Sequence, residues 1–135
     1  VLTMKSPIYS DLDLSLTANA LTGDVAAVVD AAAVRRCILR VVKLRRFDIP
    51  YEPDKSAWID EFLFDVVSVA TAAAILDRLT FALNKIEPRA TYVVTVEPGD
   101  DTLAGSAQGY DITVKFTVKT LMISGDVKYF LERVR

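Results

Sequence analysis

The segment "YDITVKFTV", residues 110–118, decides the fold, because apolar and polar side chains alternate along its whole length. A period of two is typical of a strand with one buried face and one solvated face. The segment "TYVVTVE", residues 91–97, alternates in the same way, and a polar, glycine-containing connection at 98–109 joins the two. We therefore expect an antiparallel hairpin. Its buried face is expected to comprise Tyr110, Ile112, Val114, Phe116 and Val118.

Helical periodicity occurs in two segments that precede this hairpin. Residues 31–44 repeat apolar side chains at the spacing of one helix face, namely Val34, Cys37, Ile38, Val41 and Val42. A second helix is expected from an N-cap at Thr71 to residue 86, because Pro88 disfavours helical backbone at the residue before it. A shorter helix, capped by Ser56, is expected between these two.

These elements predict an α+β fold in which a small antiparallel sheet packs against two longer helices and one short helix. With 135 residues, of which 52% are hydrophobic, the chain suits a single domain over residues 1–135. A net charge of -2, a single cysteine and a start without a secretory-signal pattern favour a soluble protein in a reducing compartment. The longest apolar-leaning run, 66–76, is too short to span a bilayer.

Both ends of the chain are expected to be extended. In "YSDLDLSL", residues 9–16, leucines alternate with aspartate and serine, which predicts a half-buried strand or an extended arm with Leu12, Leu14 and Leu16 on one side. In "SGDVKYFLERVR", residues 124–135, the pattern predicts a short strand or a tail.

The residue inventory excludes several kinds of catalysis. The sequence contains no histidine, which removes histidine-based zinc sites and serine or cysteine catalysis with a histidine base. Cys37 lies on the apolar stripe of the first expected helix and is interpreted as a core residue. The glycine-containing segments lack a phosphate-binding pattern. We therefore expect no catalytic, cofactor-binding or metal-binding residues.

Carboxylate pairs leave one enzymatic alternative open, a cell-wall glycosidase. Such an enzyme needs two carboxyl groups about 5 Å or about 6.5–9.5 Å apart. The candidate pairs are Asp60 with Glu61, Asp100 with Asp101, and Glu87 with Asp77. Neighbouring acids in loops are ordinarily solvated, so this alternative is disfavoured.

The segment 35–46 contains six basic residues and no acid. Arg36, Arg40 and Lys43 form one stripe of the first expected helix, beside its apolar face. The stripe is interpreted as a solvated face or as a docking surface for an acidic protein partner. A small nucleic-acid-binding module is a further alternative, although the segment lacks interleaved exposed aromatic residues.

The junction "IEPRATY", residues 86–92, combines both signs of charge with a rigid proline. One interpretation is a helix stop with a local ion pair, which contributes about 0–1 kcal/mol if it is exposed. The other is that Pro88 fixes the backbone so that Glu87 and Arg89 project as a rigid fork toward another chain. In both cases, replacing Glu87 or Arg89 by alanine is expected to leave the stability of the domain nearly unchanged.

The order of these motifs resembles a known family. Nearly the whole chain is similar to the small baseplate wedge proteins of contractile phage tails, a lysozyme-like or sheath-initiator family shared with type VI secretion baseplates. The matching motifs are "YSDLDLSL", "TGDVAAVVDAAAVRRCILRVVKL", "EFLFD" and, most specifically, the Glu-Pro-Arg signature in "IEPRATY". The chain departs from the family in the loop 45–57, which lacks the glycines that family members carry.

The resemblance implies a structural role without enzymatic activity. Glu87 and Arg89, joined by Pro88, would contact the helical core bundle of larger wedge proteins. The implied location is the virion tail baseplate, assembled in the host cytoplasm. The tail tube or hub is a further implied partner, and neither nucleic acid nor a membrane is expected as one.

The resemblance also assigns a role to the hairpin. The strands at 91–97 and 110–119 would template the first ring of the tail sheath protein by strand addition. Lys115 and Lys119 are expected on the solvated face of these strands. Reversing both charges should therefore impair sheath assembly without unfolding the domain.

Overall fold

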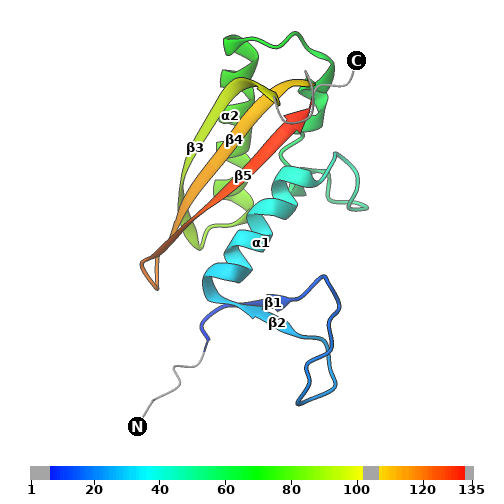
Figure 1. Cartoon of the computed structure of the whole chain (residues 1–135), viewed down its shortest axis with the longest axis vertical. Coiled ribbons are helices and arrows are strands. Elements are labelled where there is room, and N and C mark those ends of the chain that lie inside the picture. The colour runs from blue at the N-terminus through cyan, green and yellow to red at the C-terminus, as the bar shows by residue number, and fades with distance from the viewer. Residues whose placement is uncertain (1–6, 102–106, 133–135) are drawn as a thin grey trace.

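The computed structural model describes residues 7–101 and 107–132. It comprises a body of helices and one sheet, from which a small β-hairpin extends at one end (Figure 1). The elements follow in the order β1 (Ser10–Leu12), β2 (Ala27–Val29), α1 (Asp30–Lys43), η1 (Pro53–Lys55), η2 (Ile59–Phe64), α2 (Val69–Ile86), β3 (Ala90–Asp101), β4 (Ala107–Val118) and β5 (Ile123–Glu132), where η denotes a 3₁₀ helix. The predicted α+β class is confirmed.

The main sheet has three antiparallel strands in the order β3-β4-β5, and the predicted hairpin is its β3–β4 pair. Val114 in the middle of β4 pairs with Val94 of β3 and with Val127 of β5. The alternation along β4 is confirmed, because its five predicted core side chains are all buried. The sheet is therefore apolar on the face that meets the helices.

The end of β3, the start of β4 and the length of β5 differ from the sequence-based expectation. The connection predicted at 98–109 is shorter, because pairing continues from Pro98 with Tyr110 to Asp101 with Ala107. Backbone hydrogen bonds extend a ladder whatever the side-chain pattern, so polar residues do not end it. Residues 102–106 of the predicted connection lie outside the described residues. β5 is a full ten-residue strand rather than a short strand or a tail.

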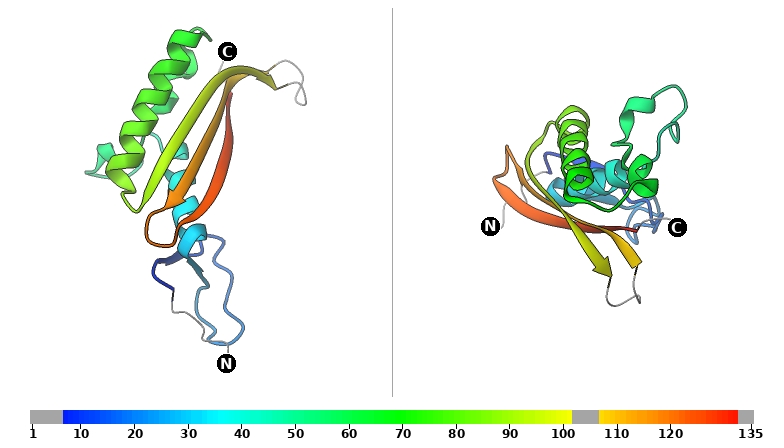
Figure 2. Two further views of the ribbon diagram at one scale, coloured as in Figure 1. Left: turned by 90° about the vertical axis from the view of Figure 1, so that its left-hand side faces the viewer. Right: turned by 90° about the horizontal axis from the view of Figure 1, so that it is seen from above.

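Both long helices lie on the apolar side of the sheet (Figure 2). α1 buries the five predicted side chains together with Ala33. α2 begins earlier than predicted, because its N-cap is Ser68, whose side chain accepts a hydrogen bond from the backbone N–H of Thr71. Asp30 does not cap α1 through its side chain. Its carboxylate accepts hydrogen bonds from the backbone N–H groups of Ile8 and Tyr9, at 3.0 and 3.2 Å.

The central loop, residues 45–58, contains no glycine, yet three of its aromatic residues adopt the left-handed backbone conformation. The φ angles of Phe47, Tyr51 and Trp58 are 67, 64 and 54°. This conformation costs a non-glycine residue about 1–2 kcal/mol. The short helix predicted after Ser56 forms as η2 without a side-chain cap. The loop is therefore held in place by its tertiary contacts rather than by local preference.

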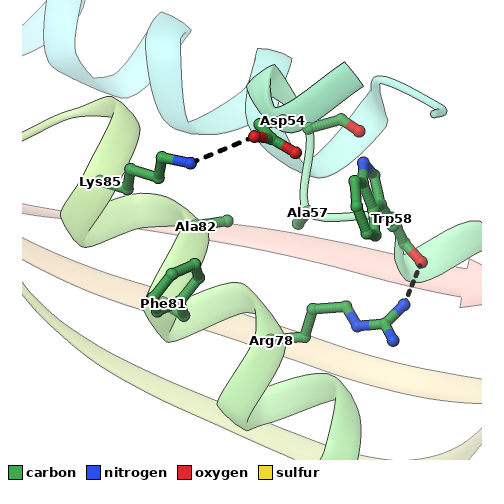
Figure 3. Close-up of a pocket in the computed structure, with 8 residues that line it drawn as sticks. Asp54, Ala57, Trp58, Arg78, Phe81, Ala82 and Lys85 are labelled. Carbon is green, nitrogen blue, oxygen red and sulfur yellow. Dashed lines mark hydrogen bonds and ion pairs between the residues drawn. The ribbon is translucent and has the colours of Figure 1, made fainter. Parts of the chain in front are cut away.

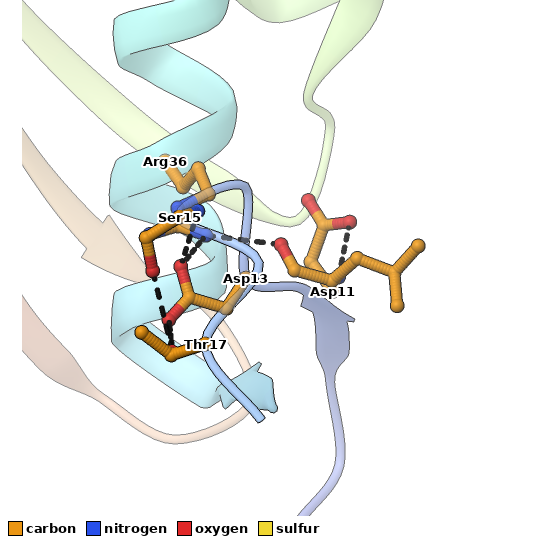
Figure 4. Close-up of polar contacts among 6 residues, drawn as sticks. Asp11, Asp13, Ser15, Thr17 and Arg36 are labelled. Atoms are coloured by element: carbon orange, nitrogen blue, oxygen red, sulfur yellow. Dashed lines mark hydrogen bonds and ion pairs between the residues drawn. The ribbon is translucent and has the colours of Figure 1, made fainter. Parts of the chain in front are cut away.

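Residues 8–29 form an N-terminal arm built on the β1–β2 hairpin, which extends beyond the end of α1 (Figure 1). The predicted half-buried leucine face is wrong, because Leu12, Leu14 and Leu16 are 62, 67 and 72% exposed. The inward side chain is Asp13, which accepts a hydrogen bond from Arg36 at 2.7 Å (Figure 4). Because the arm reaches past the body, its leucines have no second layer to pack against.

Candidate functional site

The predicted Glu-Pro-Arg site lies where α2 ends and β3 begins. Glu87 is the C-cap residue of α2, and Arg89 immediately precedes β3. Arg89 Nε donates to Glu87 Oε1 at 2.6 Å, and Arg89 Nη2 donates to Glu87 Oε2, so the ion pair is bidentate. The Glu87 side chain is 2% exposed and that of Arg89 is 30% exposed. The predicted outward fork is therefore wrong for Glu87, whose carboxylate turns inward.

Two further side chains tie Glu87 to neighbouring elements. The Tyr92 hydroxyl of β3 donates to the Glu87 carbonyl oxygen at 2.6 Å. Cys37 of α1 lies close enough to Glu87 to help lower the pKa of its carboxyl group, and Arg40 Nη2 approaches the Cys37 sulfur to 3.7 Å. Glu87 thus links the end of α2 to β3 through its carbonyl oxygen, while its carboxylate is paired with Arg89.

The surroundings of Glu87, Cys37 and Tyr92 shift the pKa of each of these side chains. Burial would raise the pKa of Glu87, but hydrogen bonds from Arg89 and Cys37 outweigh it and hold that pKa below its ordinary value of 4.5. Burial, with the nearby Glu87 charge, raises the pKa of the Cys37 thiol to about 11. Burial also raises the pKa of Tyr92. Cys37 therefore stays protonated at neutral pH, when thiols of this kind are unreactive.

The outer side of the junction is formed by Pro88, Arg89 and Lys119. Pro88 is exposed, and its carbonyl oxygen accepts a hydrogen bond from Lys119 Nζ at 3.0 Å. The guanidinium of Arg89 lies 5.1 Å from the centre of the Tyr9 ring. Lys119 was predicted on the solvated face of the strands, and it is exposed directly after the last residue of β4, where it belongs to this junction. The structure thereby joins residues that the sequence assigned to two surfaces.

The basic stripe of α1 does not form one free surface. Arg36 Nη1 donates to Asp13 and to the carbonyl oxygen of Leu12, so this guanidinium fastens the N-terminal arm (Figure 4). Arg40 is directed toward Cys37, whereas Lys43 is exposed at the end of α1. The three predicted contacts therefore have three different environments.

Lys115 is exposed on the solvated face of β4, as the alternation predicts. It pairs in register with Val93 of β3 and Asp126 of β5. Val93 is 66% exposed, so this face carries an apolar side chain beside the lysine.

Sequence reasoning missed the polar roles of Cys37, Tyr92 and Asp13. Cys37 and Tyr92 occupy inward positions of their periodic segments. Such a pattern predicts that a side chain is buried, but it does not identify a polar partner. Asp13 was expected on the solvated side of an alternating strand. No local signal pairs it with Arg36, which is 23 positions away.

The acidic pairs proposed for glycosidase chemistry are not supported by a raised carboxyl pKa. Hydrogen bonding to Arg78 at 2.8 Å lowers the pKa of Glu61. Hydrogen bonds from Ser15 and Arg36 lower that of Asp13. Within residues 7–101 and 107–132, each shifted carboxyl pKa is therefore shifted downward, whereas a general acid needs a raised one.

The remaining acidic pairs are separated or not described. Asp77 is exposed on α2, whereas Glu87 is buried at its end. The side chains of Asp100 and Asp101 lie outside the described part of the structure. The described residues contain no group of three or more cysteine or acidic side chains placed to hold a metal ion. None of the described helices is both long and apolar enough to cross a membrane.

Comparison with solved structures finds this fold in proteins that include two of low sequence identity. A candidate tail lysozyme from Geobacter sulfurreducens matches with a TM-score of 0.64 and 22% identity, over 82% of this chain and 98% of that chain. A chain of the anti-feeding prophage baseplate matches with a TM-score of 0.64 and 19% identity, over 78% of this chain and 83% of that chain. No protein-family model and no curated protein matches the sequence significantly. The chain thus shares its fold with proteins described as a tail lysozyme candidate and as part of a baseplate.

Proposed function

We propose that the chain is a structural wedge subunit in the baseplate of a contractile phage tail or a related injection machine. The observation that carries the proposal is the shared fold with a chain of the anti-feeding prophage baseplate, at a TM-score of 0.64 over 78% of this chain. The rigid Glu-Pro-Arg junction supports it, because the resemblance in sequence is most specific there.

The proposed docking surface for the helical core bundle of larger wedge proteins consists of Pro88, Arg89 and Lys119. Glu87 serves this surface from within, because its buried carboxylate fixes the Arg89 guanidinium. A guanidinium that is already held loses little conformational entropy on binding. Lys43, with Arg40, offers a second cationic contact to an acidic partner, whereas Arg36 is committed to the arm.

The proposed contact with the tail sheath protein is strand addition to the main sheet. β3 and β5 each have one neighbour in the three-stranded order, so the outer side of each is available within the described chain. Unpaired backbone groups of an edge strand accept a strand from another chain. Lys115 lies on the solvated face of the central strand and is the proposed charge contact.

A cell-wall glycosidase is the second candidate, because one structural neighbour is described as a candidate tail lysozyme. The lowered pKa values of Glu61, Asp13 and Glu87 favour the structural proposal over this one. A nucleic-acid module has less support, since Asp13 already neutralises Arg36 of the basic stripe.

The test introduces Lys119→Glu or Lys115→Glu into a contractile particle that contains this protein. Lys119→Glu should reduce baseplate incorporation, and Lys115→Glu should give baseplates with little attached sheath. Arg35→Glu, an exposed change on α1 outside the proposed contacts, is the matched control. Electron microscopy and immunoblotting of purified particles measure both outcomes. Normal sheathed particles from both variants would refute the proposed contacts, and sheathed particles formed without the protein would refute the structural role.

A further inference from the structure

We propose that the pocket between the central loop and the outer face of α2 binds a segment of another protein that carries an aromatic or long aliphatic side chain next to a carboxylate. The pocket holds about 190 Å³ and lies between Ala57 and Trp58 of the loop and Phe81 and Ala82 of α2 (Figure 3). The residues proposed for wedge docking do not line it, so the two proposals stand or fall separately.

The size and lining of the pocket fit one apolar side chain. A cavity of about 150 Å³ lined by apolar residues is large enough to hold benzene. Phe81 is 69% exposed, although it lies beside the indole of Trp58 and the methyl groups of Ala57 and Ala82. An inserted side chain would remove this apolar surface from water, which favours association.

The loop wall of the pocket is held rigidly before any partner binds. Trp58 Nε1 donates to the carbonyl oxygen of Pro53 at 2.6 Å. The guanidinium carbons of Arg46 and Arg78 lie 4.2 and 5.8 Å from the centre of the Trp58 ring. Cation–π contacts and a hydrogen bond therefore fix the indole, and such preorganisation lowers the entropic cost of binding.

Ser56 forms part of the pocket wall, but its hydroxyl oxygen is not exposed to a ligand. Its Oγ is buried and has no hydrogen-bond partner among the described residues, and the residue itself is 7% exposed. Ser56 lines the pocket. Because this oxygen is covered by protein atoms, the proposed contacts to a bound segment are those of the apolar and charged side chains of the lining.

The charge at the rim selects a carboxylate on the partner. Arg46 and Arg78 share Glu61, at 3.5 and 2.8 Å, and Lys85 lies 3.4 Å from Asp54. Three cations thus face two carboxylates in these pairs. The side chains of Lys85 and Asp54 are 52% and 65% exposed, so their pair is screened by water and is readily replaced.

A second hollow indicates that the ligand is a chain segment rather than a small molecule. This hollow holds about 330 Å³ and is lined in part by Tyr51, Pro53 and Ile86. It shares Asp54 and Lys85 with the first pocket. A segment that anchors one side chain beside Trp58 can therefore continue across the Asp54–Lys85 pair.

The probe for the test is the capped peptide acetyl-Ala-Phe-Asp-Ala-amide, added to isotope-labelled protein while amide and indole resonances are followed. One matched peptide replaces its phenylalanine by alanine, and another replaces its aspartate by asparagine. The first peptide should shift the Trp58 indole and the amides of Ala57 and Ala82, with a dissociation constant of about 1–10 mM. Each matched peptide should bind at least about threefold more weakly.

Variants distinguish binding in the pocket from nonspecific binding of the peptide to exposed apolar side chains. Phe81→Ala should weaken binding about fivefold, whereas Phe64→Ala, which removes a phenylalanine that is 74% exposed outside the pocket, should not change it. Lys85→Gln should abolish the preference for aspartate over asparagine. Because all three side chains are exposed, the spectra should keep the folded pattern. Absence of shifts at Trp58 and Ala82, equal binding by Phe81→Ala, or equal binding of all peptides would overturn the proposal.

Discussion

The Glu87 carboxylate is buried, and its charge is balanced by a residue only two positions away. Removing a carboxylate from water costs several kcal/mol, and the cost is recovered only when the geometry is good and the remaining oxygens are bonded. Arg89 meets Glu87 through Nε and Nη2, which form one edge of the guanidinium, and the Arg89 backbone N–H adds a third donor at 3.3 Å. The pair is therefore a stabilising unit of the domain as well as the anchor of its outer surface.

Arg89→Ala is predicted to destabilise the domain by about 2–4 kcal/mol. Breaking a fully buried pair costs about 3–5 kcal/mol, and partial exposure of Arg89 reduces this. This replaces the sequence-based expectation of unchanged stability, because Glu87 would remain buried without its partner. Urea unfolding measures the loss, with Arg35→Ala, an exposed change on α1, as the control. A loss as small as that of the control would show that Glu87 is hydrated in solution.

Glu87→Gln is predicted to weaken the acid dependence of stability. The pKa of Glu87 lies below 4.5 in the folded protein, so the folded state binds fewer protons than the unfolded state. Its contribution is therefore complete above pH 4.5 and is lost as the pH falls through the folded pKa. The free-energy difference between wild type and variant should shrink on acidification. Urea unfolding at several pH values measures this, and a difference that stays constant as the pH falls would contradict the prediction.

The N-terminal arm shows how one side chain positions a whole element. Its leucines are exposed, so the arm is fastened to α1 mainly by polar contacts of Asp13 and Asp30. Few buried apolar contacts make such a segment open more readily than the body. The Arg36 guanidinium, which bonds both Asp13 and the Leu12 carbonyl, is the central contact.

Arg36→Ala is predicted to accelerate amide hydrogen exchange in the arm without exposing the body. Exchange of the Asp13 and Ala26 amides, which bond the opposite strand segment, should rise about threefold or more. Amides of β4 should be unaffected, since the core does not depend on this contact. Arg35→Ala, an exposed change on the same helix, is the control. Unchanged exchange in the arm would mean that the contacts of Asp30 and Tyr9 suffice to hold it.

At the scale of the whole molecule, two helices cover one face of a three-stranded sheet, and this single interface contains the core (Figure 2). A glycosidase must hold a protonated carboxyl group and an ionised one across a sugar-sized cleft. We predict that the purified protein does not cleave peptidoglycan between about pH 4 and pH 8, the range of a tuned carboxylate pair. A lysozyme control on the same substrate validates the assay. Cleavage that disappears on changing one carboxylate would establish an enzyme instead.

The sequence by itself determined the elements that repeat an apolar pattern. The alternation of β4 and the helical stripe of α1 are local consequences of which side chains avoid water, so their buried residues were predicted individually. The Glu-Pro-Arg motif and its position at a helix-to-strand junction were also evident. Element ends were less certain, as the extension of β3 through residue 101 illustrates, because ladder hydrogen bonds depend on the neighbouring strand.

Only the tertiary structure decided which way the polar residues face. Glu87 is buried at the junction of α2 and β3, where Arg89 pairs with its carboxylate and Tyr92 bonds its carbonyl oxygen, and Leu12 is exposed because the arm extends past the core. The pocket beside Trp58 likewise forms between a loop and a helix that are separate in sequence. A local pattern predicts which apolar residues are buried. The burial of a charged residue depends instead on hydrogen-bonding partners, and the tertiary structure decides whether these lie close to it.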